Sequence, residues 1–264
     1  MFFFLDSQVV DFCQATRDFN VIHDPKYMNE RGKHVIVPGM YILASVIKGL
    51  EELFHEGLDS FRILFNALIR SGEEVLMGAD RIEPHRPDHY LFAFNGRDSF
   101  SLKQERSRIY RKQDRITFPE QVHTHELPVD ATQLNLFSQL IGCHNKRLSN
   151  LLFSLAYTSH VLNRAIAHPR DAIEREIFTL LDKSKNPDQV APFYQTLDVY
   201  LNPEQPTAGE ISHLNYRVLF ERMVRNKAYT AYITCTRQAG RIFRARYKLI
   251  AIPDRLIMRL AKDL

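Results

Sequence analysis

The chain has 264 residues, of which 45% are hydrophobic and 25% are charged, enough for one large domain or two small ones with a real core. The formal net charge is only +4, too weak to indicate a protein that binds nucleic acid. The three cysteines show neither metal spacing nor a disulfide framework, and no segment reaches the roughly 20 apolar residues of a membrane span. We therefore expect a cytoplasmic protein without a membrane anchor, a metal or a cofactor.

The first half of the chain is predicted to form helices followed by strands. Its apolar start at residues 1–5 suggests a first strand or the lead-in to a helix. Pro38 is well placed to open an apolar, amphipathic helix. The expected elements are a short helix at 7–14, a polar loop that continues to Lys33, a helix at 39–53, and strands at 61–69, 73–82, 89–95 and 100–111.

The second half repeats this order after a break between residues 115 and 130 that contains Pro119 and Pro128. A single long helix cannot bury itself, but an antiparallel sheet wrapped around it can do so. The chain is thus predicted to be an α+β protein with two domains, at 1–118 and 119–264. The elements expected in the second half are a short helix at 131–140, a long helix at 148–167, and strands at 177–181, 193–201, 210–221, 227–237 and 241–251.

Three polar side chains with catalytic potential lie close together in the first half: Asp18, Asn20 and His23. A carboxylate and an imidazole held near each other can position one water molecule and move its protons. Gly39 follows Pro38 at a predicted helix start, where backbone N–H groups can hold an oxyanion. Each residue also has a structural interpretation. Asp18 and Asn20 can be turn or cap residues, His23 can be a histidine with its hydrogen bonds satisfied, and Gly39 can be a glycine needed for helix packing.

The overall plan resembles the hotdog fold, and its doubled form resembles the double-hotdog enzymes. Residues 12–44 look like the hydratase signature of the MaoC-like, or (R)-specific enoyl hydratase, family, in which Asp-x-Asn-Pro-(Ile/Leu)-His precedes a His-Gly-Met helix start. The matching segments are Asp18-Phe19-Asn20-Val21-Ile22-His23 and Pro38-Gly39-Met40. This sequence departs from the family at Val21, where proline is usual, at Pro38, where histidine is usual, and at Thr16-Arg17, where Ser-Gly is usual.

The resemblance implies two tandem hotdog folds, each an antiparallel sheet around a long central helix. It implies that Asp18 and His23 share one water, that Asn20 orients it, and that the Gly39 N–H holds the thioester oxygen. Pro38, Met40 and Arg17 would then contact the substrate. The reaction would be hydration of a 2-enoyl thioester of coenzyme A or acyl carrier protein, or the reverse dehydration.

The second half has no matching carboxylate, and His144 and Asn145 resemble the motif only weakly. We expect this half to shape an acyl tunnel, with one active site per chain at the interface between the halves. A doubled hotdog already contains a pseudo-dimer, so we expect a monomer or a homodimer.

Two other functions fit the same scaffold. A hotdog thioesterase would place an acidic residue near the long helix, but Glu51 and Glu52 lie far along it. A non-catalytic acyl-thioester-binding protein would explain Val21 and Pro38. A phosphopantetheine carrier should meet a basic rim, for which the candidates are Arg17, Arg31, Lys33, Arg106 and Arg108.

Overall fold

The computed structural model describes residues 2–48, 60–65, 68–75, 77–82, 89–94, 97–104, 118, 122–181, 193–202, 211–223, 228–237 and 240–250. Within them the helices are α1 (Asp6–Thr16), α2 (Pro25–Asn29), α3 (Gly39–Lys48), α6 (Ala131–Ile141), α7 (Lys146–Ala156), α8 (Thr158–Ala167) and α9 (Ala172–Leu180), with a 3-10 turn, η1 (Val21–His23). No helix in these ranges is long and apolar enough to cross a membrane.

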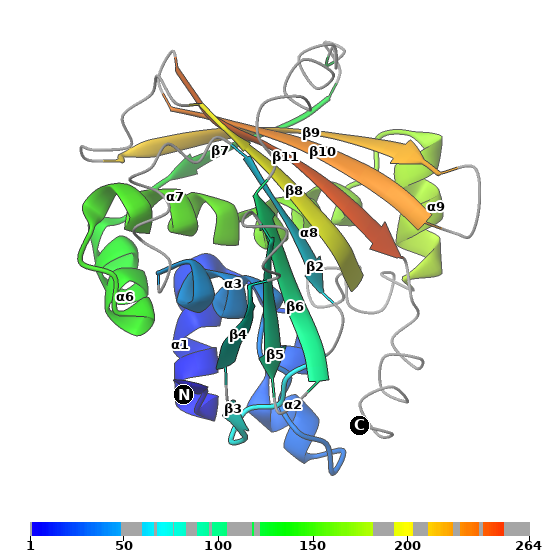
Figure 1. Ribbon diagram of the computed structural model, residues 1–264. Coiled ribbons are helices and arrows are strands. Elements are labelled where there is room, and N and C mark those ends of the chain that lie inside the picture. Colours follow the sequence, from blue (N-terminus) through cyan, green and yellow to red (C-terminus); the bar gives the residue numbers. More distant parts are fainter. Residues whose placement is uncertain are drawn as a thin grey trace.

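The described strands form one continuous antiparallel sheet and one short ribbon. The sheet contains β2 (Ser60–Phe65), β4 (Met77–Ile82), β5 (His89–Phe94), β6 (Arg97–Gln104), β7 (His123–Pro128), β8 (Phe193–Leu201), β9 (His213–Arg222), β10 (Ala228–Arg237) and β11 (Gly240–Ile250). Its order is β4-β5-β6-β2-β8-β11-β10-β9-β7. The ribbon pairs β1 (Phe2–Phe3) with β3 (Glu74–Val75). The large sheet curves over α3, α7 and α8 (Figure 1).

The four sheet strands that follow the helices have the same connectivity in both halves, and the halves meet where β2 pairs with β8. The first of these strands in each half lies at the junction; it is β2 in the first half and β8 in the second. The last strand of each half, β6 or β11, pairs with it on the outer side. The intermediate strands then follow outward in reverse order. The helices match as well, since α1 packs against α6 and α3 packs against α7.

The core between sheet and helices contains a chain of aromatic rings that crosses from one half to the other. Phe12 of α1 stacks on Tyr41 of α3, with ring centroids 4.5 Å apart. It also contacts Phe137 of α6 at 5.7 Å, which in turn meets Phe153 of α7 at 5.4 Å. All four rings are buried. Aromatic rings supply much of a core's apolar area, so this row of four rings fixes the helices of both halves to each other.

One predicted strand is a helix in the structure. Residues 177–181 belong to the end of α9 and the residue after it, rather than to a strand. The cap explains the difference, because the Asp171 carboxylate accepts the N–H of Glu174 at 2.8 Å. Glu174, Ile177 and Leu181 are all buried, and their spacing is that of one helix face.

Three further expectations need correction. The polar loop that should run to Lys33 contains η1 and α2, and Asp24 caps α2 by accepting the N–H of Lys26 at 2.9 Å. The long helix at 148–167 is two helices, which are separated at Tyr157. The second half does not begin with a helix either, because β7 precedes α6.

The strand expected at 73–82 is two strands, β3 in the ribbon and β4 in the large sheet, and the remaining predicted elements agree with the structure to within a few residues at their ends. The helix at 131–140 and the strand at 193–201 correspond closely to α6 and β8. Residues 49–53 of the expected first long helix and 105–111 of the expected fourth strand lie outside the described residues.

Candidate active site

Asp18 is turned into the protein by the way α1 ends. Arg17 closes that helix in the left-handed conformation, with φ 55°, and is the only described non-glycine residue with positive φ. The N–H of Asp18 then donates to the carbonyl of Cys13 at 3.0 Å, which satisfies a carbonyl of the last helical turn. As a result Arg17 is exposed, whereas Asp18 is only 8% exposed.

Asn20 organises the turn that carries His23. Its side-chain oxygen accepts the N–H of Ile22 at 3.5 Å, and its carbonyl accepts the N–H of His23 at 2.9 Å. The first of these contacts is long for a hydrogen bond, so the backbone contact is the firmer of the two. Asn20 is buried and acts in the structure as the cap of η1.

His23 is held in a defined orientation by the chain segment that leads into α3. Its Nδ1 lies 2.6 Å from the carbonyl oxygen of Ile36, and the N–H of Ile36 donates to Ile22 at 2.9 Å. Because a carbonyl can only accept, Nδ1 carries the proton and Nε2 of the neutral ring keeps its lone pair. Burial lowers the pKa of His23, although the Asp18 charge and the bond to Ile36 oppose this. A neutral imidazole with a free Nε2 is suited to accept a proton.

The Asp18 carboxylate lies among groups that come from the second half. Burial raises the pKa of Tyr194 on β8 and of Tyr247 on β11, and the Asp18 charge raises both further. The same charge acts on His160 of α8, in the direction that raises its pKa. Beneath these groups the Tyr247 hydroxyl hydrogen-bonds the Thr158 hydroxyl at the start of α8. The charge of this carboxylate in the first half therefore acts on residues of the second half.

Gly39 begins α3, and Pro38 and Met40 beside it are buried. The carbonyl of Pro38 accepts the N–H groups of Tyr41 and Ile42, at 2.9 and 3.2 Å. The first N–H groups of a helix have no acceptor within it, so those of Gly39 and Met40 are the donors available at this end. A Cβ at Gly39 would lie 3.0 Å from Cε1 of Phe65, so close packing is one reason for glycine here.

An open groove of about 670 Å³ is lined by Arg17 and Phe19, the two sequence neighbours of Asp18, but not by Asp18 itself. Tyr157 and His160 at the start of α8 line the groove as well. His125 of β7 also borders the groove, and its buried Nε2 has no hydrogen-bond partner in the part of the chain that the structure describes. The groove thus combines apolar, cationic and imidazole groups.

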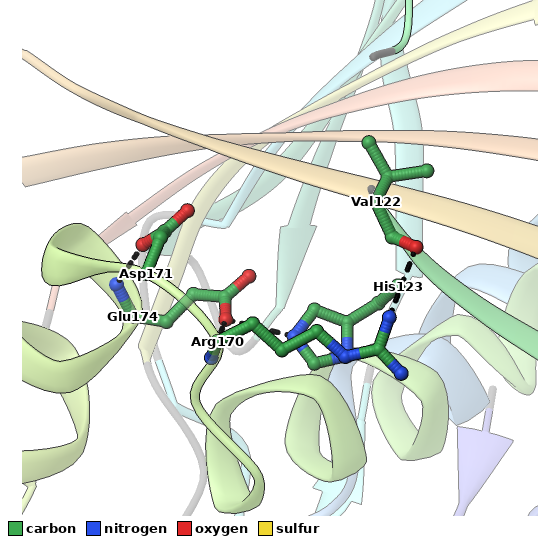
Figure 2. A network of polar contacts seen from close by, with 5 residues as sticks. All are labelled: Val122, His123, Arg170, Asp171 and Glu174. Carbon is green, nitrogen blue, oxygen red and sulfur yellow. Dashed lines mark hydrogen bonds and ion pairs between the residues drawn. The ribbon is translucent and has the colours of Figure 1, made fainter. Parts of the chain in front are cut away.

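A polar network centred on the buried pair His123 and Glu174 lies behind His125, which borders the groove. Figure 2 shows Glu174 of α9 between His123 and Arg170, with its Oε2 at 2.7 Å from Nε2 of His123 and 2.6 Å from the N–H of Arg170. The bonds from these donors lower the pKa of Glu174, against the effect of burial. His123 stacks on His125 with ring centroids 6.1 Å apart. Burial and the positive groups around it lower the pKa of His125 to about 4.

The structure brings together some of the sequence candidates and separates others. Asp18, Asn20 and His23 are buried in one segment, and Arg17 faces the adjoining groove. His144 is exposed, and Asn145 caps α7 by accepting the N–H of Leu148 at 3.1 Å. The guanidinium of Arg31 lies over the ring of Tyr27, 3.6 Å from its centroid. Glu51, Glu52, Arg106 and Arg108 lie outside the described residues.

The groove residues of the second half are not predicted by the sequence motif. Two signals were present: His123 and His125 alternate as residues on one face of a strand do, and His160 and Arg164 have the spacing of one helix face. Neither pattern indicates by itself which element lies opposite. Among the described residues no group of three His, Cys, Asp or Glu side chains could hold a metal ion.

No protein-family model matches the sequence, and no curated protein matches it. Among solved structures, a MaoC-like dehydratase is similar over 94% of this chain and 95% of its own, with 10% identity and a TM-score of 0.54. A bifunctional dehydratase-cyclase domain of ambruticin biosynthesis has 13% identity, coverages of 87% and 86%, and a TM-score of 0.46. An acyl-CoA thioesterase II of Mycobacterium marinum has 11% identity, coverages of 80% and 89%, and a TM-score of 0.42.

Proposed function

We propose that this chain, which has the MaoC-like hotdog fold, adds water to 2-enoyl thioesters or removes it from 3-hydroxyacyl thioesters. The observation that carries the proposal is the arrangement of His23. Its Nδ1–H is fixed on the Ile36 carbonyl, so its Nε2 accepts protons, and the buried Asp18 carboxylate acts on the same ring. A fixed base beside a carboxylate is what activation of a single water molecule requires.

The roles of the other residues follow from the same proposal. Asn20 holds the turn that carries His23, and in this way it positions the base. The N–H of Gly39 at the positive end of α3 stabilises the charge that develops on the thioester oxygen. Pro38 and Met40 shape the apolar surface beside that oxygen.

The groove is proposed as the route by which the acyl thioester reaches Asp18. Its walls include the apolar side chains of Phe19 and Val161, and its rim includes the Arg17 cation. This composition suits a thioester whose acyl part is apolar and whose carrier, coenzyme A or acyl carrier protein, is anionic.

We also propose that the chain is a tandem of two hotdog units, divided at 118/119, with the catalytic residues in the first unit. The matching strand order of the two halves and the pairing of α1 with α6 and of α3 with α7 support this division. The second unit then supplies the far wall of the groove, through α8 and β7.

The test is an assay with crotonyl and longer 2-enoyl thioesters of coenzyme A, in which the enoyl absorbance and free thiol are followed together. Loss of the enoyl signal without thiol release is expected. Asp18→Asn and His23→Ala should each lower kcat by about 10²-fold or more. Asp24→Asn is the matched control, because Asp24 is exposed and an asparagine can still cap α2. Equal activity in wild type and Asp18→Asn would refute the assignment.

One observation favours a second candidate, a non-catalytic acyl-thioester-binding protein. The ring of Phe65 packs directly over the Cα of Gly39, where the first proposal needs access for the thioester oxygen. If this packing closes the oxyanion position, the assay will detect neither reaction although the thioester binds. Release of thiol would instead identify a thioesterase.

A further inference from the structure

The contact of His160 with the chain segment of Asp18 has no counterpart in the sequence motif. Nδ1 of His160 lies 3.0 Å from the carbonyl oxygen of Arg17, the residue just before Asp18. As with His23, a carbonyl acceptor requires the proton on Nδ1, which leaves Nε2 of the neutral ring with its lone pair. Two imidazoles of the same tautomer, one from each half of the chain, are thus fixed by backbone carbonyls, and the Asp18 charge acts on both.

His160 differs from His23 in its exposure to the groove. His160 is half-buried and lines the groove, whereas His23 is buried and is not among the residues that line the groove. The ring of Tyr157 packs edge-on against it at a centroid distance of 5.1 Å, which restricts its rotation. A fixed, groove-facing imidazole can touch a bound substrate, while the Asp18–His23 pair acts from the buried side.

The charged groups around His160 come from three elements. Asp18 follows α1 and favours its protonated form, whereas Arg17 on the same segment and Arg164 on α8 disfavour it. His125 on β7 faces it as well, since His160 is among the groups that lower the pKa of His125. Burial is the largest influence and lowers the pKa of His160 below its usual value. Burial thus favours the neutral ring, whose Nε2 can accept a proton.

We propose that His160 is a third member of the proton-transfer centre, facing the substrate from α8 while Asp18 and His23 hold the water. This inference rests on the proposed function. In dehydration, Nε2 of His160 takes the proton from Cα, and the C–H electron pair becomes the C=C bond. When the Asp18–His23 pair carries an added proton, it gives that proton to the hydroxyl oxygen as the Cβ–O bond breaks, and water leaves. Hydration is the reverse, and the proton that has moved between His160 and the pair returns through solvent, so each turnover adds or removes one water and no net proton.

His160→Gln separates this role from a structural one. The glutamine amide can still donate to the Arg17 carbonyl, but it cannot accept a proton. We expect kcat with crotonyl-coenzyme A to fall about 10²-fold or more, with little change in KM. His144→Gln, at an exposed histidine, is the matched control and should behave as wild type. Normal kcat in His160→Gln with a defect only in His160→Ala would show a positioning role and overturn the proposal.

A second measurement does not depend on turnover. In protein labelled with 15N-histidine, NMR titration reports the tautomer and titration midpoint of each ring. Asp18→Asn should lower the midpoints of both His160 and His23, and the His144 signal should not move. An unchanged His160 midpoint would overturn the proposal. If the wild type is inactive toward every enoyl thioester, the proposed function is wrong, and so is the catalytic role of His160. If the wild type is active and His160→Gln keeps that activity, only the role of His160 is wrong.

Discussion

Arg62 on β2 and Asp198 on β8 form the charged pair that joins the two halves of the sheet. Nε of Arg62 lies 2.5 Å from Oδ1 of Asp198 and Nη2 lies 3.3 Å from Oδ2, so the contact is bidentate. Arg246 of β11 approaches the same carboxylate with a single contact of 3.5 Å. Asp198 is buried, and the two arginines satisfy its charge from neighbouring strands on either side.

Arg62→Gln should therefore destabilise the fold more than Arg246→Gln. Removal of Arg62 leaves a buried carboxylate with one weaker partner, which should lower the free energy of unfolding by about 2 kcal/mol once the partial exposure of Arg62 is considered. Arg246→Gln should cost less than about 1 kcal/mol. Urea unfolding at pH 7 measures both values. A larger loss for Arg246→Gln would contradict the bidentate contact as the main one.

Gly39→Ala should destabilise the protein although alanine favours helices. The added Cβ would lie 3.0 Å from Cε1 and 3.2 Å from Cδ1 of Phe65. Overpacking of this kind costs about 1–2 kcal/mol. Phe65→Leu in the same chain should recover most of the loss, and a double-mutant cycle by urea unfolding measures the coupling. Strictly additive effects would mean that the two residues do not interact.

Arg17→Gly should stabilise the fold and weaken substrate binding at the same time. Glycine adopts the left-handed conformation of residue 17 without strain, which is worth up to about 1 kcal/mol. The loss of the groove cation should raise KM for a coenzyme A thioester. Arg17→Ala is the matched control, since it removes the cation and keeps the strain. Thermal unfolding and steady-state kinetics separate the effects; an equal gain in stability from alanine would exclude the conformational explanation.

The free energy of unfolding should fall as the pH drops below about 6.5. The pKa values of His23, His125 and His160 are lowered in the folded chain, so between those values and 6.5 the unfolded state binds more protons. Stability therefore rises with pH in this window and is lost on acidification. Urea midpoints between pH 8 and pH 5 measure the slope. His125→Gln should flatten it and His144→Gln should not; a slope that His125→Gln leaves unchanged would exclude His125 as a contributor.

Local patterns were sufficient for most elements and for the position of the candidate catalytic segment at residues 18–23. Strand β8 and helix α6 follow from alternation and a cap, and the Asp18–His23 spacing lies within one short turn. Helix α9 was missed because its apolar run resembles a strand until the Asp171 cap is considered. His125 and His160 could not be assigned from sequence, because only the tertiary fold brings β7 and α8 to the groove that Arg17 and Phe19 also line. The resemblance to MaoC-like proteins is confirmed for the fold.

The uninterrupted ladder of the sheet also bears on how the chain avoids aggregation. Among the described strands of the large sheet only β4 and β7 lie at an edge. A chain cut between its halves would expose β2 and β8 as two new edges, each with a row of unpaired N–H and C=O groups that can template pairing with other chains. The covalent link keeps these strands together at any protein concentration, so the continuous chain avoids the exposed strand edges that separate halves would present.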